Sequence, residues 1–305
     1  MADLELIQVA FSIRDLEGTP AWYRDTFGYL DAGVHTEFRG ADAAAVQGLP
    51  ASESTIHWLV DARDGFQLEL FAFDEPAPRG DAHERGADAV GYSLIGVAVD
   101  DFDAVLAKVA PLGPVVGAAG SRRVAVRDPE GVIVEVMEDD PRPSGAPPRK
   151  RPEVPVTTRF VRLVVPDLAR ARAFYTEKMG LAEAPAIHGP EHEALWGLEG
   201  IAVTTQAMWA GDFVLELAEY VSPRPRADGY RLSDQGLVNV ALGCLGPEPY
   251  DAAFARLEGT GFTAYKELAA DGFKCRYVED DQGNSVEMLY MSAKPRKSFG
   301  FSPVG

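Results

Sequence analysis

Apolar and polar residues alternate along short stretches of this chain, and the stretches recur in the same order. Alternation over 7–13 and over 160–165 predicts two strands, and each is followed by an amphipathic stretch of helical period that ends at a glycine. Hairpin patterns with glycine in their turns come next. A further strand, a helix and a group of strands then follow at 93–135 and at 237–287. The pattern predicts an α+β fold built from four βαβββ modules, two in each half of the chain.

The two halves also end in matching phrases, which indicates an internal repeat. Residues 127–135 read RDPEGVIVE and residues 279–287 read EDDQGNSVE, so each phrase is a polar turn with glycine followed by a short strand. The strand places Glu135 or Glu287 four residues after the glycine. A repeat of this length indicates one structural unit used several times.

A proline-rich segment separates the halves. Six prolines fall within residues 140–155, and proline at this density gives an extended connector that cannot join the interior of a sheet. We therefore expect two domains of two modules each, at 1–139 and at 156–305, joined by this linker.

Composition and charge exclude several classes of partner. The net charge of −18 argues against nucleic acid and against an anionic membrane surface, because both are bound through an excess of Lys and Arg. Cys244 and Cys275 stand in apolar, strand-like contexts that are typical of reduced core residues, and neither a secretory signal nor a long apolar span is seen. We expect a cytoplasmic protein whose partner is a small hydrophobic or aromatic molecule, and the sequence leaves a homodimer open.

These features resemble the vicinal oxygen chelate superfamily, which includes glyoxalase I, bleomycin-resistance proteins and extradiol ring-cleaving dioxygenases. The resemblance rests on the Asp-Leu after the first strand of each half, the Tyr-containing helix, its closing glycine and the strand-end Glu. It implies that two modules pair their sheets into a cup-shaped half-barrel, so that each half of this chain forms one cup. It also implies that metal ligands of the family come from the first and fourth strands of each module.

The length and order of the chain resemble the extradiol dioxygenases most. That resemblance implies an iron site in the second domain, with two His and one Glu beside a Tyr. Glu287 and Tyr277 match the Glu and the Tyr, but Phe160 and Asn239 stand where the two His are expected. Because iron(II) that activates oxygen needs a facial triad of good ligands, ordinary extradiol cleavage is disfavoured.

The corresponding positions of the first domain are Gln8, Glu69, Leu94 and Glu135. The chain thus keeps a Glu at every fourth-strand position, Glu216 included, and has no His at the positions where the family binds metal. We expect no metal cofactor. If a hard divalent cation binds, its expected ligands are Gln8, Glu69 and Glu135, since oxygen ligands suit magnesium or calcium.

Chemistry is expected from the carboxylates of the C-terminal cup. A carboxyl group in an apolar cup has a raised pKa, and two of them close together form a proton-sharing acid–base pair near neutral pH. We expect Glu216 and Glu287 to face each other, with Asn239 as a hydrogen-bonding group and Tyr277 as an acid. The alternative is that the glutamates are structural and paired with arginines, for which the candidates are Arg123, Arg162 and Arg276.

Residues expected to bind the substrate surround that cup. They are Phe160, Thr205 and Arg276 on strands, Trp209 at a hairpin end, and His188 and His192 in a loop that can lie over the cup mouth. Gly189 and Pro190 argue against a helix in that loop, so the two histidines are not expected to form a helical metal pair.

These observations predict an enzyme that works by carboxylate acid–base chemistry on a small aromatic or polyketide-like molecule, as a lyase, an isomerase or a ring-opening enzyme. Two alternatives stay open. The first is a protein that binds and sequesters a drug or a metabolite in the same cup. The second is an extradiol-type dioxygenase with an unusual metal site, for instance with His188 or His192 as relocated ligands.

Overall fold

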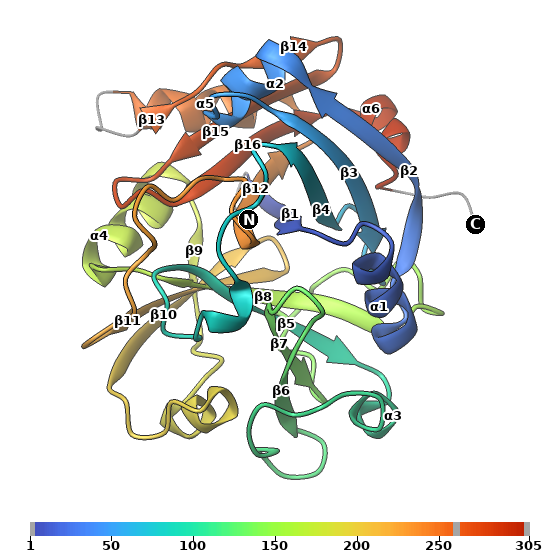
Figure 1. Ribbon diagram of the computed structural model, residues 1–305, viewed down its shortest axis with the longest axis vertical. Coiled ribbons are helices and arrows are strands. Elements are labelled where there is room, and N and C mark those ends of the chain that lie inside the picture. Colours follow the sequence, from blue (N-terminus) through green and yellow to red (C-terminus); the bar gives the residue numbers. More distant parts are fainter. Residues whose placement is uncertain (1–3, 259–262, 302–305) are drawn as a thin grey trace.

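The computed structural model describes residues 4–258 and 263–301 and shows an α+β fold with two open sheets (Figure 1). The first half contains β1 (Glu5–Ile13), α1 (Gly18–Phe27), β2 (Leu30–Arg39), α2 (Gly40–Gln47), β3 (Glu53–Val60), β4 (Gln67–Glu75), the short helix η1 (Ala82–Glu84), β5 (Gly91–Val99), α3 (Phe102–Leu106), β6 (Arg123–Arg127) and β7 (Ile133–Met137). The second half contains β8 (Val156–Val164), α4 (Leu168–Ala173) continued by η2 (Phe174–Lys178), β9 (Ala182–Ala184), η3 (Pro190–Trp196), β10 (Val203–Ala210), β11 (Phe213–Tyr220), β12 (Gly236–Cys244), α5 (Pro247–Leu257), β13 (Thr263–Ala264), β14 (Leu268–Ala270), β15 (Phe273–Glu279), β16 (Ser285–Met291) and α6 (Ala293–Ser298).

The predicted module recurs four times, but in one copy a strand is incomplete. In the second module the strand between α3 and β6 is represented by isolated bridges, Pro111 to Val126 and Val116 to Arg123. Within each module the first and last strands lie side by side and parallel, as β1 and β4 do. The sequence repeat therefore identified the unit of construction correctly.

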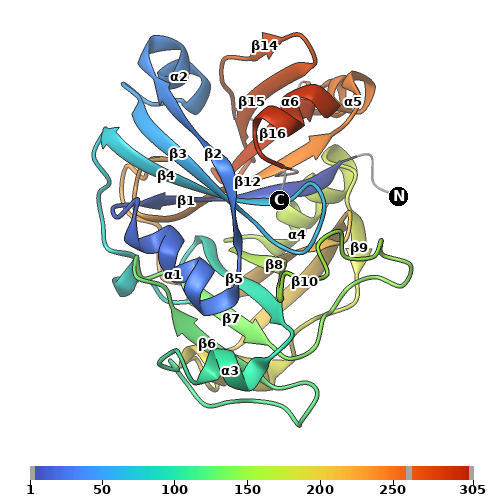
Figure 2. The same ribbon diagram turned by 90° about the vertical axis from the view of Figure 1, so that its right-hand side faces the viewer.

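Two sheets hold these modules together (Figure 2). Over the described residues, the first sheet has the strand order β13-β15-β16-β12-β1-β4-β3-β2, with β14 also paired to β15, and the second has the order β6-β7-β5-β8-β11-β10-β9. The modules of each sheet meet through antiparallel pairs of their first strands, β1 with β12 and β5 with β8.

The pairing of modules crosses the two halves of the chain. The first module (β1–β4) shares a sheet with the last (β12–β16), and the second (β5–β7) shares a sheet with the third (β8–β11). The expectation that each half, 1–139 or 156–305, closes a cup of its own is therefore wrong. The repeat does not specify partners, because β1, β5, β8 and β12 are all almost fully buried and occupy the same place in their modules.

The largest apolar cluster contains side chains from both sheets and from the helices. Val9 and Phe11 of β1 and Val240 of β12 belong to it, together with Tyr23 of α1 and Tyr250 of α5. Each sheet carries a separate, smaller cluster. Alternation along a strand thus sends one residue in two to the common core and leaves the others for the opposite face of the sheet.

The proline-rich linker is packed against the fold. Arg151 is buried and donates hydrogen bonds to the carbonyl oxygens of Asp61, at 3.0 Å, and Phe301, at 2.9 Å. Arg149 pairs with Asp100 at 2.6 Å. The basic residues of the linker therefore anchor it to both halves.

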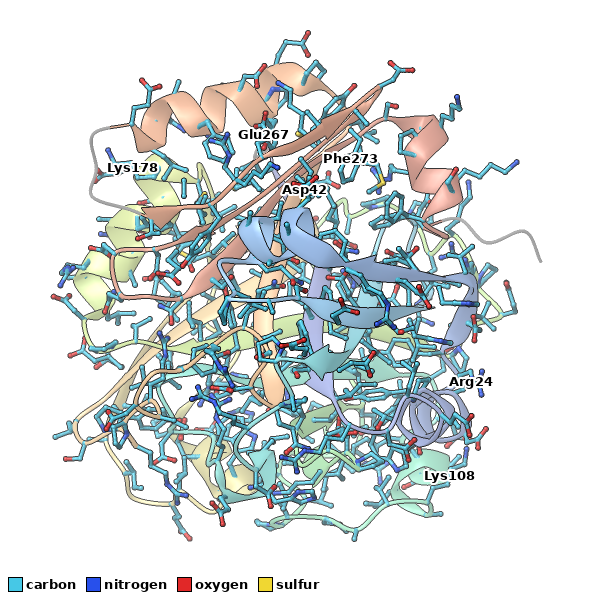
Figure 3. The ribbon with its side chains drawn as sticks, turned by 45° about the horizontal axis from the view of Figure 1, so that its top comes forward. Arg24, Asp42, Lys108, Lys178, Glu267 and Phe273 are labelled. Atoms are coloured by element: carbon cyan, nitrogen blue, oxygen red, sulfur yellow. The ribbon has the colours of Figure 1, made fainter. Side chains whose placement is uncertain are left out.

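Charged side chains extend from the outer surface, as Arg24, Asp42, Lys108 and Lys178 do in Figure 3. Some also join modules: Nζ of Lys108, after α3, donates to the carbonyl oxygen of Asp25 on α1 at 2.8 Å. No helix in the described part of the chain combines the length and apolarity needed to cross a bilayer.

A protease site inserted between Gly145 and Ala146 tests the crossed pairing. After cleavage we expect the two halves to elute together in gel filtration and to separate only in denaturant, because β1–β12 and β5–β8 join them through backbone hydrogen bonds. Each half prepared alone should unfold or aggregate, since its first strands lose a neighbour. Two folded fragments that separate in plain buffer would contradict the crossed pairing.

Candidate active site

One face of the first sheet forms a cup, here called the first cup, whose floor is made by the four central strands. Gln8 and Ala10 of β1 face into it, and antiparallel pairing sets Ala10 opposite Asn239 of β12. Parallel pairing sets Glu69 of β4 beside Ala10. The same arrangement recurs on β12 and β16. Ala241 of β12 lies opposite Gln8, and parallel pairing sets Glu287 of β16 beside Ala241. Because residues two apart point to the same face of a strand, the four polar side chains converge.

Each of these four side chains leaves a buried oxygen without a partner. Gln8, Glu69, Asn239 and Glu287 are between 1% and 6% exposed. Among the described residues, no hydrogen bond reaches Oε1 of Gln8, Oε2 of Glu69, Oδ1 of Asn239 or Oε2 of Glu287. Buried polar atoms are almost always paired, so four unpaired oxygens in one cup indicate a place built for a ligand.

Neighbouring side chains hold the other oxygen of each carboxyl group. Trp58 Nε1 donates to Oε1 of Glu69 at 3.0 Å, and Cys275 Sγ donates to Oε1 of Glu287 at 3.1 Å. Tyr277 lies opposite Glu287 across the β15–β16 hairpin. Each carboxyl group therefore has one oxygen fixed by the protein and one oxygen available.

Burial raises the pKa of both carboxyl groups. It raises the pKa of Glu287 to about 7, against the opposing effects of Cys275 and Tyr277 beside it. Burial, and then the charge of Glu287, raise the pKa of Glu69 well above its usual range. Burial and the two carboxylates also raise the pKa of Tyr277. Near neutral pH the pair therefore retains a proton that it can give up or take back.

A cavity of about 180 Å³ opens over these groups and is otherwise mostly apolar. Gln8, Glu69 and Glu287 line it together with Tyr277 and Cys275, and its apolar walls are Phe38, Ile56, Trp58, Phe71, Leu268, Phe273, Leu289, Met291 and Phe299. Phe273, labelled in Figure 3, stacks on Phe299 with ring centroids 5.7 Å apart, and Trp58 meets Phe299 edge-on. The walls suit a flat, apolar ligand.

The oxygen atoms of the first cup fit a hard divalent cation. Magnesium and calcium take carboxylate and amide oxygens, which are the groups left unpaired on Gln8, Glu69, Asn239 and Glu287. Glu135, expected as the third oxygen ligand, lies instead on β7 of the second sheet. Within the described ranges no group of three or more His, Cys, Asp or Glu side chains is arranged to hold a metal.

The second cup, on the corresponding face of the second sheet, has different residues at the equivalent positions. Leu94 and Phe160 replace the two amides of the first cup, and Gly96 and Arg162 replace the two floor alanines. The ring of Phe160 lies over Gly96 so closely that a Cβ there would be 1.7 Å from Cε1. The floor of this cup is therefore covered by side chains of the protein itself.

Ion pairs fill the rest of the second cup. Arg162 Nε donates to Oε2 of Glu216 at 2.6 Å, and Nη1 of the same guanidinium donates to Oε1 of Glu193 at 3.1 Å. Arg123 Nη1 donates to Oε1 of Glu135 at 3.2 Å. The alternative in which glutamates pair with arginines is thus confirmed for Arg162 and Arg123.

His188 completes this network between the two carboxylates. Its Nδ1 lies 2.7 Å from Oε1 of Glu216, and its Nε2 lies 3.1 Å from Oε2 of Glu135. Burial lowers the pKa of His188, but Glu216 and Glu135 outweigh that effect and the net shift is upward. Burial raises the pKa of Glu216, and Arg162 and His188 more than offset this, so that it falls to about 2. In the second cup, Glu135 and Glu216 are therefore ionised and paired, which is a structural arrangement.

The residues predicted to act together divide between the two cups. Asn239, Tyr277 and Glu287 meet in the first cup as expected, and Glu69 from the other half of the chain joins them. The expectation that Glu216 faces Glu287 is wrong, because Glu216 lies on β11 in the second sheet. The cup expected from the C-terminal half alone does not exist, since its strands pair with the first half.

None of the predicted substrate-binding residues lines the first cup. Phe160 and His188 fill the second cup, and the ring of His192 lies 5.2 Å from that of His188. Thr205 and Trp209 lie on β10, opposite Ala218 and Val214 of β11. Arg276 lies opposite Met288 of β16 in the strand register, on the other face of β15 from Tyr277. The error for Arg276 is a one-residue shift in register, which moves a side chain to the other face.

Two residues that donate hydrogen bonds to the carboxyl groups of the first cup were not among the site residues predicted from the sequence. Trp58 lies opposite Glu69 in the β3–β4 hairpin, and Cys275 is two residues before Tyr277 on β15. Both could have been found by alternation, since each shares a face with a candidate. Gln8 and Glu69 were recognised, but they were assigned to the wrong cup.

The comparisons with known proteins agree with this architecture. The family model for the Glyoxalase/Bleomycin resistance protein/Dioxygenase superfamily matches residues 5–136 and 158–288. A point mutant of glyoxalase I from Zea mays is 16% identical, with a TM-score of 0.63 and 94% of each chain covered. A putative dioxygenase from Bacillus subtilis subsp. subtilis str. 168 is 13% identical, with a TM-score of 0.63, 94% of this chain covered and 85% of that one. No curated protein matches the sequence.

Identities this low show a shared fold and leave the activity open. The two stretches matched by the family model cover both halves, including β1, β4 and β12 and the part of β16 that carries Glu287. The chain therefore belongs to the Glyoxalase/Bleomycin resistance protein/Dioxygenase superfamily.

Proposed function

We propose that this chain is an enzyme that moves protons on a small, largely apolar molecule bound in the first cup, as an isomerase or a lyase. One observation carries the proposal: Glu69 and Glu287 are buried in the same apolar cavity and each has a raised pKa. A carboxyl group that titrates near neutral pH is suited to act as general acid or base at the pH of the cell.

The two carboxyl groups have complementary roles in this scheme. The ionised member of the pair removes a proton from the substrate, and the protonated member delivers one. Trp58 and Cys275 fix one oxygen of Glu69 and of Glu287, so that the other oxygen of each is free to exchange the proton. Tyr277 stays neutral because its pKa is raised, and its hydroxyl is available as a hydrogen-bond donor.

The cavity limits the class of substrate. Its volume of about 180 Å³ is small for a ligand pocket, and aromatic rings form much of its wall. A strongly charged molecule would lose its hydration there without finding a basic side chain, because no Lys or Arg among the described residues lines the cavity. These properties support a small aromatic or polyketide-like molecule with a carbonyl or hydroxyl group.

A divalent cation is compatible with the same site. Gln8, Glu69, Asn239 and Glu287 would hold it through their unpaired oxygens. When bound, such a cation would supply Lewis-acid polarisation of a substrate oxygen. The hydrogen bonds from Trp58 and Cys275 would keep the carboxyl groups oriented in the loaded protein as well.

A protein that only binds and sequesters a drug or metabolite is the second candidate. The apolar walls of the first cup favour it, since they suffice to bind a flat ring without any chemistry. A binding protein has no use for a proton-sharing carboxyl pair, which costs stability when it is buried. Loss of one carboxyl group should therefore stop proton transfer by an enzyme, but it should not stop ligand binding by a sequestering protein.

We expect Glu287→Gln to abolish proton transfer while leaving the first cup intact. The reaction can be followed by NMR as incorporation of solvent deuterium into a panel of small aromatic ketones and hydroxyketones. Turnover should fall by about 100-fold or more, which is the usual size of a general acid–base contribution, because Gln has the shape of Glu but cannot exchange a proton in the same way. Retained turnover in Glu287→Gln would exclude this role for the pair.

Glu216→Gln provides a matched control in the second cup. It makes the same Glu-to-Gln change at an equivalent strand position, but it removes the carboxylate that Arg162 and His188 share. We expect this variant to lose about 3 kcal/mol of stability, because two buried cations each lose one of their carboxylate partners, and to keep the turnover of its folded fraction. Equal losses of turnover in both variants would show that the effect is not specific to the first cup.

The stability of the protein should also depend on pH through Glu287. Its pKa is about 7 in the folded state against 4.5 in the unfolded state, so the folded state binds the proton more tightly. Stability from this group is complete below about pH 4.5 and is lost as the pH rises to about 7. Urea unfolding should show that the wild type loses up to about 3 kcal/mol over this window relative to Glu287→Gln. Parallel pH profiles of the two proteins would contradict the raised pKa.

A further inference from the structure

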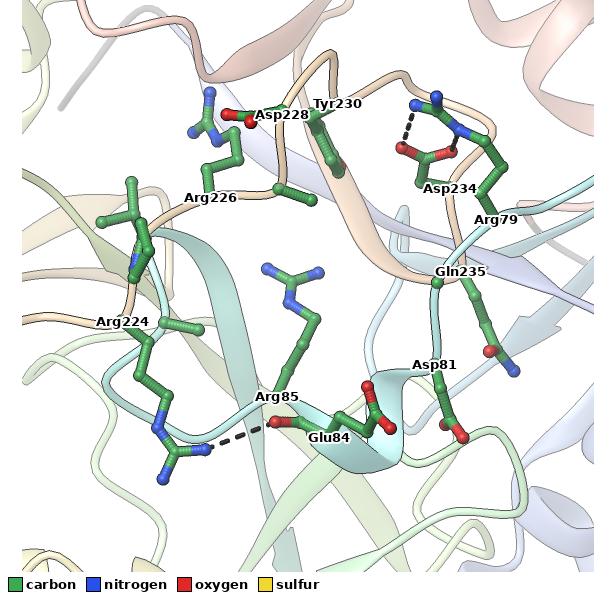
Figure 4. Close-up of a pocket in the computed structure, with 15 residues that line it drawn as sticks. Arg79, Asp81, Glu84, Arg85, Arg224, Arg226, Asp228, Tyr230, Asp234 and Gln235 are labelled. Carbon is green, nitrogen blue, oxygen red and sulfur yellow. Dashed lines mark hydrogen bonds and ion pairs between the residues drawn. The ribbon is translucent and has the colours of Figure 1, made fainter.

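A second cavity, of about 510 Å³, lies away from both cups (Figure 4). Its walls come from the segment after β4, residues 79–90, and from the segment between β11 and β12, residues 224–235. None of its fifteen residues lines the cavity of the first cup. The two segments belong to different halves of the chain, so the crossed pairing of modules creates this cavity.

Four arginines line the cavity, and two of them are neutralised by carboxylates. Arg79 makes a two-pronged contact with Asp234, with Nε and Nη2 at 2.9 and 2.8 Å from the two carboxylate oxygens. Arg224 Nε lies 3.1 Å from Oδ1 of Asp88. Arg79 and Arg224 therefore make ion pairs that stabilise the walls of the cavity.

The other two arginines, Arg85 and Arg226, have no carboxylate partner within the described parts of the chain. Arg85 donates one long hydrogen bond, 3.3 Å, to the carbonyl oxygen of Tyr92, and its guanidinium stands in the middle of the cavity in Figure 4. Arg226 donates to the carbonyl oxygen of Gly283 and to the side chain of Asn284. Because a guanidinium has five N–H donors, these hydrogen bonds do not use all the donors of either group.

The two guanidinium groups are also close to each other. A Cβ built on Gly91 would lie 3.5 Å from Nη2 of Arg85 and 3.5 Å from Nη2 of Arg226, so at most twice that distance separates the two atoms. The positive charges of both groups lower the pKa of Tyr230, but burial outweighs them and the net shift is upward. Two like charges at this separation repel, and an anion between them removes the repulsion.

We propose that this cavity binds a small molecule through a single oxyanion group, a phosphate or a carboxylate, held between Arg85 and Arg226. The planar forks of two arginines match the oxygens of either group. The apolar part of the wall, which includes Ala89, Val90 and Pro225, receives the body of the ligand. A protein with a net charge of −18 is a poor general binder of anions, so such binding has to come from a local site.

The acidic residues of the cavity restrict the charge of the ligand. Asp81 is engaged with the backbone and ring of His83, but Glu84 and Asp228 also line the cavity and make no ion pair within the described residues. Their charges repel any further negative group on the ligand. The site therefore takes one oxyanion and disfavours a polyphosphate.

The test is a calorimetric titration of the full chain with phenyl phosphate and, separately, with benzoate, each of which joins one oxyanion to an apolar ring. We expect saturable binding of at least one probe with a Kd of about 1 mM or tighter. Arg85→Gln and Arg226→Gln should each weaken it about tenfold or more, because each removes charge-assisted hydrogen bonds. Arg224→Gln is the matched control, since Arg224 lines the same cavity but is paired, and it should change the Kd by less than about threefold.

Further comparisons distinguish phosphate from carboxylate, and the charge of Arg85 from its geometry. Tighter binding of phenyl phosphate identifies phosphate as the recognised group, and tighter binding of benzoate identifies carboxylate. Arg85→Lys keeps the charge but loses the fork, so it should bind more weakly than the wild type and more tightly than Arg85→Gln. Thermal melting of every variant checks that it is folded.

Three results would overturn the proposal. They are the absence of saturable binding of both probes to the wild type, equal weakening by Arg224→Gln and by folded Arg85→Gln and Arg226→Gln, and binding that responds to Glu287→Gln in the first cup while Arg85→Gln leaves it unchanged. The third result would place the probe in the first cup.

Discussion

A carboxylate buried in the hollow of a curved sheet has to be neutralised, because burial removes the water that stabilises its charge. The two cups of this protein meet that constraint in different ways. In the second cup Arg162 and His188 pair with Glu216, whose pKa falls to about 2. In the first cup no basic side chain of the described chain pairs with Glu69 or Glu287, and the pKa of both rises. The same repeated strand thus carries a structural anion in one cup and a titrating acid in the other.

The floor residues decide which of these outcomes a cup has. Small residues such as Ala10 in the first cup leave room above the sheet for four polar side chains and a cavity. In the second cup the equivalent positions bring Arg162 into the hollow and the ring of Phe160 over Gly96. A large cationic side chain on the floor neutralises the carboxylate, and an aromatic ring fills the hollow. Little room is then left for a ligand. The repeat therefore sets the scaffold, and two or three floor residues set the function of each cup.

Local patterns in the sequence revealed much of this structure. The repeat predicted the four modules, the strand-end phrase marked Glu135 and Glu287, and the family resemblance placed Tyr277 beside Glu287. The pairing of modules was not predictable in the same way, because β1, β5, β8 and β12 are similarly buried first strands and their partners are set by contacts distant in sequence. The assignment of Glu216 to the active cup failed for that reason. Arg276 failed for a different one, since a shift of one residue in register reverses the face of a strand.

The central claim is that Glu69 and Glu287 form a proton-sharing pair in a largely apolar cup. The most direct measurement is an NMR titration of chelator-treated protein labelled with ¹³C at the glutamate carboxyl carbons, comparing the wild type with Glu69→Gln and Glu287→Gln. The account predicts carboxyl signals that titrate near pH 7 or above in the wild type and that disappear or shift strongly in each variant. Titration of every glutamate below about pH 5 in the wild type would contradict it.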